Sequence, residues 1–196
     1  SSLILVKHSL PEIVPTVPAS QWLLSEEGRL RSQILAQKLS NITLNNFSSI
    51  EPKAVETAQI IANYFDKPFE VVEDLHEHDR SKVGFLDKNN FNESVARFFS
   101  QPEALVFGGE TANQAHNRFS RAVDRITAEY SNTNMAIITH GTVLTLWVSR
   151  MINCEPFSLW KNLSLPSWVT LSYPNLELVN VFKSVENEDV YAVVQQ

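Results

Sequence analysis

Hydrophobic and polar residues follow two different periods along the chain, which predict strands and helices in turn. Short apolar or alternating runs predict strands at 3–6, 47–49, 69–73 and 135–139. Apolar residues at helical spacing predict helices at 25–39, 52–65 and 111–130, about 92–99, and after residue 140. This alternation implies right-handed crossovers and a mainly parallel sheet with helices on both faces.

The predicted elements have start signals of the expected kind. Ser25 supplies an N-cap oxygen before Glu26 and Glu27, whose charges suit the positive end of a helix. Pro52 fits the first turn of the next helix. Residues 8–22 contain three prolines, so this segment should be an ordered loop rather than a helix.

The last part of the chain has a different pattern. Strand-like runs at 168–173 and 176–181 flank Pro174-Asn175, which predicts a hairpin, and 191–194 could form a last edge strand. We therefore expect a single three-layer α/β/α domain over residues 1–196, with a mainly parallel sheet and a C-terminal hairpin or edge strand.

Composition narrows the function classes. The chain has 196 residues, 43% of them hydrophobic and 19% charged, and a formal net charge of -6. No run of Lys or Arg is present, which speaks against nucleic-acid binding. No apolar stretch approaches the roughly 20 residues of a membrane span. Cys154 is the single cysteine, so no intrachain disulfide can form; we expect a small core residue and a cytoplasmic protein.

Two histidines follow predicted strands directly. His8 comes one residue after the first strand region and His140 immediately after the run at 135–139. Ligands of open α/β sheets bind at the carboxyl ends of the strands. If both strands are central, both imidazoles reach the same edge of the sheet.

Groups that favour an anion lie near these histidines. His140 precedes a helix, whose N-terminal amides and dipole attract negative charge, and Lys7 and Lys53 add cations. Each residue alone has a plainer interpretation: a buried, hydrogen-bonded histidine or a solvated lysine. Their combination predicts a phosphate pocket.

Five segments in order resemble the histidine phosphatase superfamily, the phosphoglycerate mutase-like proteins. Leu5-Val6-Lys7-His8-Ser9 resembles the family's Arg-His-Gly signature, and the segment from Leu24 to Arg29 its helix start. A further segment of the family is similar to Ser48-Ser49 followed by Lys53-Ala54-Val55-Glu56-Thr57-Ala58. Gly109-Glu110-Thr111 and Thr139-His140-Gly141 complete the set. The resemblance covers about three quarters of the chain.

The resemblance implies a phosphatase that hydrolyses a small phosphate monoester through a phosphohistidine, without metal or organic cofactor. His8 would be the nucleophile and His140 a donor to the phosphoryl group. Leu75-His76-Glu77 matches the family's acid segment, which implies Glu77 as general acid and then base. Lys7, Lys53 and Thr142 would bind phosphate.

Three positions and one short segment depart from the family pattern. Lys7 and Lys53 stand where the family has arginine, and Ser9 stands where it has glycine. Ile50-Glu51-Pro52 replaces the usual Pro-Leu start of the family's second segment. Lysine binds phosphate as a point charge and lacks the planar fork of arginine. A non-catalytic family member that binds a phosphometabolite is therefore an alternative function.

Two further alternatives remain. His76-Glu77-His78, with His116, could serve a metal-dependent hydrolase, although a polar surface loop is the simpler interpretation. A phosphomutase is less favoured, because the mutases of this family usually carry longer insertions that cover the site and the segment between Glu77 and Gly108 is moderate in size. Trp22, Arg80 and Phe85 are candidates to line the pocket. Substrate identity and oligomeric state stay open.

Overall fold

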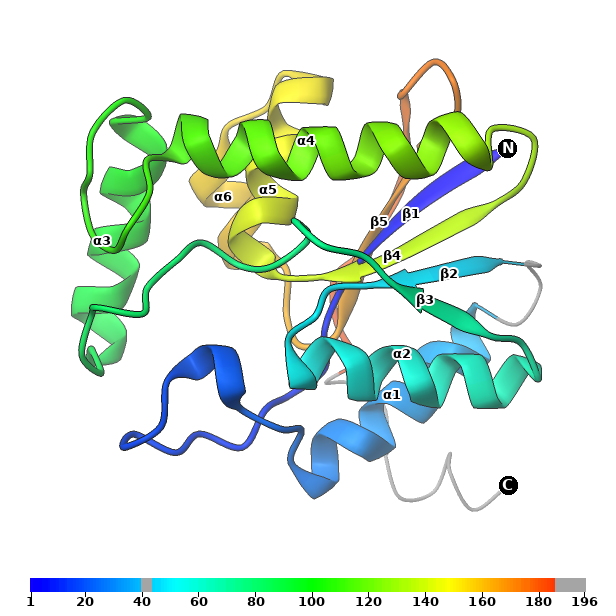
Figure 1. Cartoon of the computed structure of the whole chain (residues 1–196), viewed down its shortest axis with the longest axis horizontal. Helices are drawn as coiled ribbons and strands as arrows, with labels where there is room; N and C mark the ends of the chain where they lie inside the picture. Colours follow the sequence, from blue (N-terminus) through cyan, green and yellow to red (C-terminus); the bar gives the residue numbers. More distant parts are fainter. Residues whose placement is uncertain (40–43, 186–196) are drawn as a thin grey trace.

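One mixed sheet lies between two layers of helices (Figure 1). The computed structural model describes residues 1–39 and 44–185. Within these ranges six strands follow the order β3-β2-β4-β1-β5-β6 across the sheet. The first four in this order are parallel, and β5 and β6 are antiparallel to their neighbours. The strands are β1 (Ser2–Lys7), β2 (Asn45–Ser48), β3 (Phe69–Val71), β4 (Met135–Thr139), β5 (Ser167–Ser172) and β6 (Leu178–Phe182).

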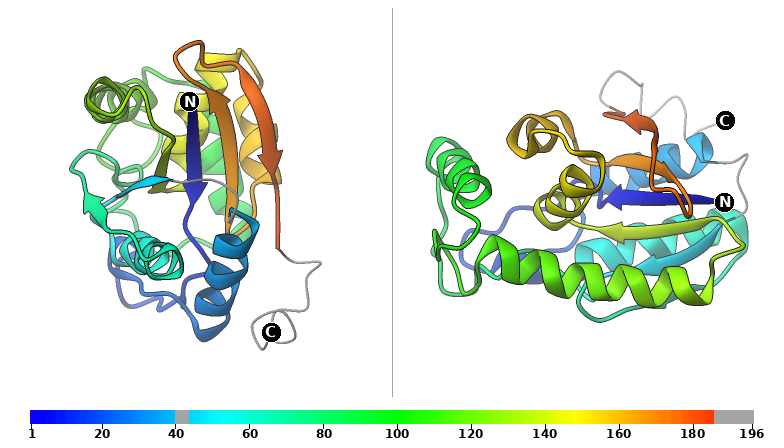
Figure 2. Two further views of the ribbon diagram at one scale, coloured as in Figure 1. Left: turned by 90° about the vertical axis from the view of Figure 1, so that its right-hand side faces the viewer. Right: turned by 90° about the horizontal axis from the view of Figure 1, so that it is seen from above.

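The helices divide between the two faces of the sheet (Figure 2). One face carries α1 (Glu26–Lys38) and α2 (Pro52–Phe65). The other carries α4 (Ala112–Glu129), α5 (Gly141–Ile152) and α6 (Pro156–Asn162). Helix α3 (Lys88–Ser100) lies beyond the carboxyl ends of β1 and β4, and the short 3-10 helix η1 (Ala19–Gln21) lies in the first loop (Figure 1).

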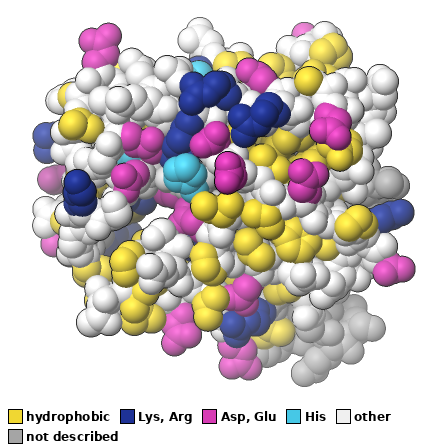
Figure 3. All heavy atoms as spheres, viewed as in Figure 1, with side chains coloured by type: hydrophobic (Ala, Val, Ile, Leu, Met, Phe, Trp, Pro, Cys, Tyr) yellow, Lys and Arg dark blue, Asp and Glu magenta, His cyan; other side chains and the backbone are white. Residues whose placement is uncertain are grey.

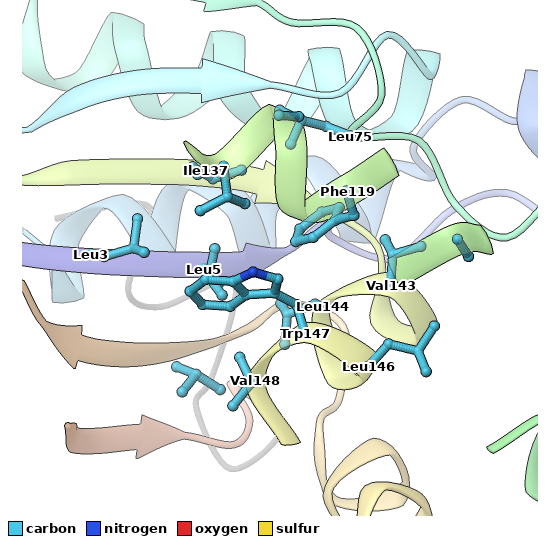
Figure 4. Close-up of a cluster of buried hydrophobic side chains, with 14 of the residues drawn as sticks. Leu3, Leu5, Leu75, Phe119, Ile137, Val143, Leu144, Leu146, Trp147 and Val148 are labelled. Atoms are coloured by element: carbon cyan, nitrogen blue, oxygen red, sulfur yellow. The ribbon is translucent and has the colours of Figure 1, made fainter. Parts of the chain in front are cut away.

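Alternating side chains of β1 build both halves of the core. Leu3 and Leu5 belong to the cluster on the α4 and α5 face, which Figure 4 shows around Trp147. Ile4 and Val6 belong to the cluster under α1 and α2. A strand buried on both faces must be apolar at every position, which explains the continuous apolar run.

The predicted fold class is confirmed, and so are most element boundaries. Ser25 Oγ accepts a hydrogen bond from the Gly28 amide at the start of α1, and Pro52 is the first residue of α2. The C-terminal hairpin is β5 paired with β6. The predicted edge strand at 191–194 lies outside the described residues.

Two details differ from the predictions. Helix α6 was not predicted, because its seven residues are too few to show a helical period. Cys154 is exposed just after α5, so the expectation of a core cysteine was wrong. None of the described helices is long and apolar enough to span a lipid bilayer.

Candidate active site

The register of two parallel strands brings the two predicted histidines together. Lys7 of β1 pairs with Thr139 of β4, so the next residue of each strand is His8 and His140. The His8 amide donates to the Thr139 carbonyl at 2.9 Å. The two imidazole rings are 5.1 Å apart between centroids, and both are buried. The predicted meeting of these side chains at one sheet edge is therefore observed.

The imidazole of His8 has a defined tautomer. Its Nδ1 lies 2.7 Å from the carbonyl oxygen of Ser9. A carbonyl can only accept, so Nδ1 carries the proton and the lone pair of the neutral ring is on Nε2. Burial, followed by the nearby His140 and Lys53, lowers the pKa of His8 well below its usual value. His8 is therefore a neutral nitrogen base at neutral pH.

Ser9 is accommodated where the family has glycine. Its hydroxyl donates to the Gly28 carbonyl at 2.6 Å, and its amide donates to Thr57 Oγ1 at 3.0 Å. Both polar groups of this fully buried residue thus have partners. The serine ties the loop after β1 to helices α1 and α2, and it leaves the His8 ring in place.

His140 contacts a carboxylate that the sequence analysis missed. Its Nε2 is 2.9 Å from Glu51 Oε2 and 2.8 Å from Ser49 Oγ, while its buried Nδ1 has no hydrogen-bond partner among the described residues. Burial alone would raise the pKa of Glu51, but His140 and Lys53 outweigh burial and hold that pKa well below its usual range. The only sequence signal was an acid just before Pro52, within the departing segment.

Both predicted lysines lie in the same cavity as the histidines. Lys7 Nζ donates to the Leu163 carbonyl at 2.8 Å, and burial lowers the pKa of Lys7 to about 8. Lys53 Nζ donates to the Ala19 carbonyl at 2.6 Å and is 3.6 Å from Glu51. Burial lowers the pKa of Lys53 as well. Each ammonium has three protons, so each retains donors for a ligand.

Glu77 occupies the helix end where an anion was expected. Its carboxylate accepts the backbone amides of Thr142 and Val143, at 3.0 and 3.1 Å, at the start of α5. Burial alone would raise the pKa of Glu77, but Arg80, His140 and the amides of Thr142 and His78 outweigh burial and lower the pKa to about 2. Glu77 is thus ionised at neutral pH, and the two amides at the start of α5 already have an acceptor.

A buried ion pair holds the segment that carries Glu77. The guanidinium of Arg118 in α4 donates to the carbonyls of Asp74, His76 and Glu77, and it pairs with Glu110 at 2.6 Å. Because four contacts fix one planar group, the turn after β3 is anchored to α4. This anchoring explains how an irregular loop can hold Glu77 in a fixed position.

Arg80 is a further cation of the pocket, and the sequence analysis assigned no role to it. Its guanidinium donates to Thr142 Oγ1 at 2.8 Å and to His78 Nδ1 at 3.3 Å. It also lies over the rings of Phe91 and Phe107, at 4.8 and 5.3 Å from the centroids. These two hydrogen bonds use two of the five N–H donors of the guanidinium, so the fork keeps donors for a ligand next to the predicted phosphate ligands.

The predicted residues line one cavity of about 1150 Å³. Its wall includes all six predicted site residues, together with Trp22, Arg80 and Phe85. Figure 3 shows a hollow on the left of the molecule, with charged side chains above it and hydrophobic side chains below it. We call Lys7, His8, Glu51, Lys53, Glu77, Arg80, His140 and Thr142 the inner cluster.

The alternative metal site does not form from the predicted residues. The ring nitrogens of His78 face Glu110 and Arg80, and the carboxylate of Glu77 caps α5. Among residues 1–39 and 44–185, no three His, Cys, Asp or Glu side chains are grouped so that they could hold a metal ion. His116 does not line the cavity.

Solved structures with the same architecture include several hydrolases. A mycobacterial hydrolase matches 99% of this chain and 96% of its own, with a TM-score of 0.77 and 14% identity. A phosphoserine phosphatase from Entamoeba histolytica, in complex with 3-phosphoglyceric acid, matches 94% of this chain and 98% of its own, with a TM-score of 0.74 and 19% identity. The α-ribazole phosphatase of Shigella flexneri matches 94% and 96%, with a TM-score of 0.72 and 18% identity. At these identities the likeness concerns the fold.

Sequence comparison gives the family. Phosphoglycerate mutase-like protein 4 of Arabidopsis thaliana is 28% identical over 131 aligned positions, and the match covers 62% of this chain. The match spans only 56% of that relative's length. The family model of the histidine phosphatase superfamily (branch 1) matches residues 17–179. This chain therefore belongs to the histidine phosphatase superfamily.

Proposed function

We propose that the chain hydrolyses a phosphate monoester through a phosphohistidine on His8. The observation that carries the proposal is the state of the His8 ring. Its Nδ1 proton is bound by the Ser9 carbonyl, and burial favours the neutral form. An imidazole in this state presents a lone pair on Nε2 that can attack phosphorus, as nucleophilic catalysis requires.

In the first step the Nε2–P bond forms as the bond from phosphorus to the alcohol oxygen breaks. Negative charge on the non-bridging oxygens needs donors, and Lys7, Lys53 and Thr142 are the proposed ligands, with His140 as a further donor. Arg80 joins this set, because its fork is held beside Thr142. It would supply the planar guanidinium that Lys7 and Lys53 lack.

Glu77 is the proposed proton carrier. In the second step it takes a proton from the water that attacks the phosphohistidine, and its low pKa in the free protein suits that carboxylate form. In the first step it must hold a proton for the departing alkoxide. A bound phosphate dianion next to Glu77 would raise the pKa of its carboxyl by like-charge repulsion, which favours this protonation.

Glu51 is the proposed positioning partner of His140. Its carboxylate lies 2.9 Å from His140 Nε2 and also accepts the Glu77 amide at 2.8 Å. It therefore links the second histidine to the loop of the proposed acid. The complete cycle uses protein side chains and water, so we expect turnover in the presence of a chelator.

The second candidate function is phosphometabolite binding without turnover. The capped state of Glu77 favours it, because both carboxylate oxygens already accept backbone amides. Lysine instead of arginine at positions 7 and 53 favours the same candidate function. Such a protein would bind inorganic phosphate but leave esters intact.

Hydrolysis of p-nitrophenyl phosphate in EDTA, by the wild type, His8→Ala and His116→Ala, tests the proposal. We expect turnover by the wild type and by His116→Ala, whose histidine lies outside the cavity. His8→Ala should lose more than about a thousandfold in kcat. Turnover that stops in EDTA would indicate a metal enzyme. Phosphate binding without any turnover would support the second candidate.

A further inference from the structure

The cavity continues beyond the inner cluster into a part whose wall is mostly hydrophobic. We call this part the outer chamber and define it by Ile13, Trp22, Ile50, Phe85, Phe91, Phe107 and Trp160, all of which line the cavity. The whole cavity of about 1150 Å³ is slightly larger than the pockets that usually hold drug-sized ligands. A phosphoryl group fills a small fraction of it, so the outer chamber has room for a large second part of a substrate.

Aromatic rings connect the two parts of the cavity without a break. Arg80 of the inner cluster lies over Phe91, and the ring of Phe91 is 5.8 Å from Trp160 and 6.4 Å from Phe107 between centroids. In the loop of residues 8–24, the ring centroid of Trp22 is 5.6 Å from Lys53 Nζ of the inner cluster. A ligand with its phosphoryl group among the cations therefore meets aromatic surface as soon as it leaves them.

The polar atom of Trp22 is already satisfied within its own loop. Its Nε1 donates to the carbonyls of Val14 and Val17, at 3.1 and 2.9 Å. The indole thus offers the cavity its ring rather than a hydrogen-bond donor. At the rim, Ile13 and Phe85 keep 58% and 60% of their surface exposed. Large apolar side chains on two separate loops at one cavity mouth indicate a binding surface.

Charged groups on the wall of the cavity outside the inner cluster offer little to a second anionic group. Arg118 is paired with Glu110, and Asp79 accepts hydrogen bonds from the amide and hydroxyl of Ser81. Lys88, at the start of α3, is the other lining Lys or Arg in the described part of the chain, and it is exposed, so water and salt screen its charge. The chamber would bind a carboxylate or a second phosphate poorly compared with an apolar group.

We infer that the substrate is a phosphate monoester of an alcohol with a large apolar body, such as a long alkyl or fused aromatic group. This inference rests on the proposed function, because it places the ester phosphate in the inner cluster. The apolar body would lie between the Trp22 wall and the Phe91 wall, with Phe85 and Ile13 closing over its far end. Small polar esters would reach the cations but leave the chamber filled with water.

The test compares n-butyl, n-hexyl and n-octyl phosphate with phosphoserine and a phosphoserine peptide, below micellar concentrations. We expect kcat/KM to rise with chain length, by up to roughly fourfold per methylene group. Phe85→Ser should lower kcat/KM for octyl phosphate by about tenfold and change that for phosphoserine by less than about twofold. Val179→Ser, which removes an exposed apolar side chain of β6 outside the cavity, is the matched control and should change neither.

Two results would overturn the inference while the phosphatase function stands. One is a kcat/KM that does not depend on alkyl length; the other is faster hydrolysis of phosphoserine or the peptide than of octyl phosphate. Failure of the proposed function would look different, since no ester would be hydrolysed. Calorimetric titration with the same alkyl phosphates would then still support the chamber if octyl phosphate bound more tightly than butyl phosphate, and overturn it if both bound equally.

Discussion

The inner cluster and the outer chamber are neighbouring parts of one cavity, but they are built in opposite ways. Six of the eight residues of the inner cluster stand at the ends of β1 and β4 and at the starts of α2 and α5, and Glu77 and Arg80 come from the loop after β3. Most of the polar atoms of the inner cluster have assigned partners. The outer chamber is built mainly from the loop of residues 8–24 and the segment of residues 76–91, with large apolar side chains exposed at its rim. Strand ends and helix starts thus position most of the groups proposed for the chemistry, whereas loops supply much of the surface proposed for the substrate body.

Among the substitutions in the two parts of the cavity other than His8→Ala, Glu77→Gln is expected to lower kcat the most. Glutamine keeps the size of the side chain but cannot carry a proton to an alkoxide. Esters with poor leaving groups, such as alkyl phosphates, should lose about 10² to 10⁴-fold in kcat, and p-nitrophenyl phosphate much less. Steady-state rates over a series of leaving groups measure this. Equal losses for all esters would remove Glu77 from the role of acid.

The Arg80→Lys substitution tests whether Arg80 binds the phosphoryl group or only shapes the wall of the outer chamber. Lysine retains the charge but loses the fork that reaches Thr142 and the stacking on Phe91. Inhibition by vanadate should weaken by about 10- to 100-fold. The control is Arg121→Lys, since Arg121 lies exposed on α4 outside the cavity. An unchanged vanadate inhibition constant in Arg80→Lys would place Arg80 with the structural residues of the chamber.

The same comparison explains how far the sequence could predict the site. His8 and His140 follow strands with strong local patterns, and parallel register alone brings them together. Arg80 could be named only as a candidate lining residue, because nothing local fixes the direction of a side chain in an irregular segment. Glu51 was missed for a related reason: its contact with His140 joins residues distant in sequence. The fold, which depends on periodic patterns, was predicted almost completely.

The low pKa of Lys7 predicts a pH effect on the inner cluster. In the free protein Lys7 has a pKa of about 8, so its charge is present below that pH and is lost above it. Affinity for inorganic phosphate should therefore fall above pH 8, by up to about tenfold per pH unit. Lys7→Arg keeps its charge and should remove most of this fall. The same pH profile in wild type and Lys7→Arg would show that Lys7 does not bind phosphate.

Ser9→Gly has the smallest expected effect. The substitution restores the family residue and removes the hydrogen bond from the Ser9 hydroxyl to the Gly28 carbonyl. The free energy of unfolding should decrease by about 1 kcal/mol, while kcat stays within about twofold. Urea denaturation of wild type, Ser9→Gly and Ser9→Ala measures it, and the alanine variant separates the lost hydrogen bond from the flexibility of glycine. A large fall in kcat would mean that Ser9 takes part in the reaction.

The central claim is that His8 is the nucleophile, and the most direct test is to find the phosphoryl group on it. The wild type and His8→Ala would be mixed with p-nitrophenyl phosphate in EDTA and quenched in alkali, where phosphohistidine survives. Peptide mass spectrometry then locates the modification. The account predicts a phosphoryl group on His8 in the wild type and neither modification nor turnover in His8→Ala. A phosphoryl group on another residue, or undiminished turnover by His8→Ala, would contradict it.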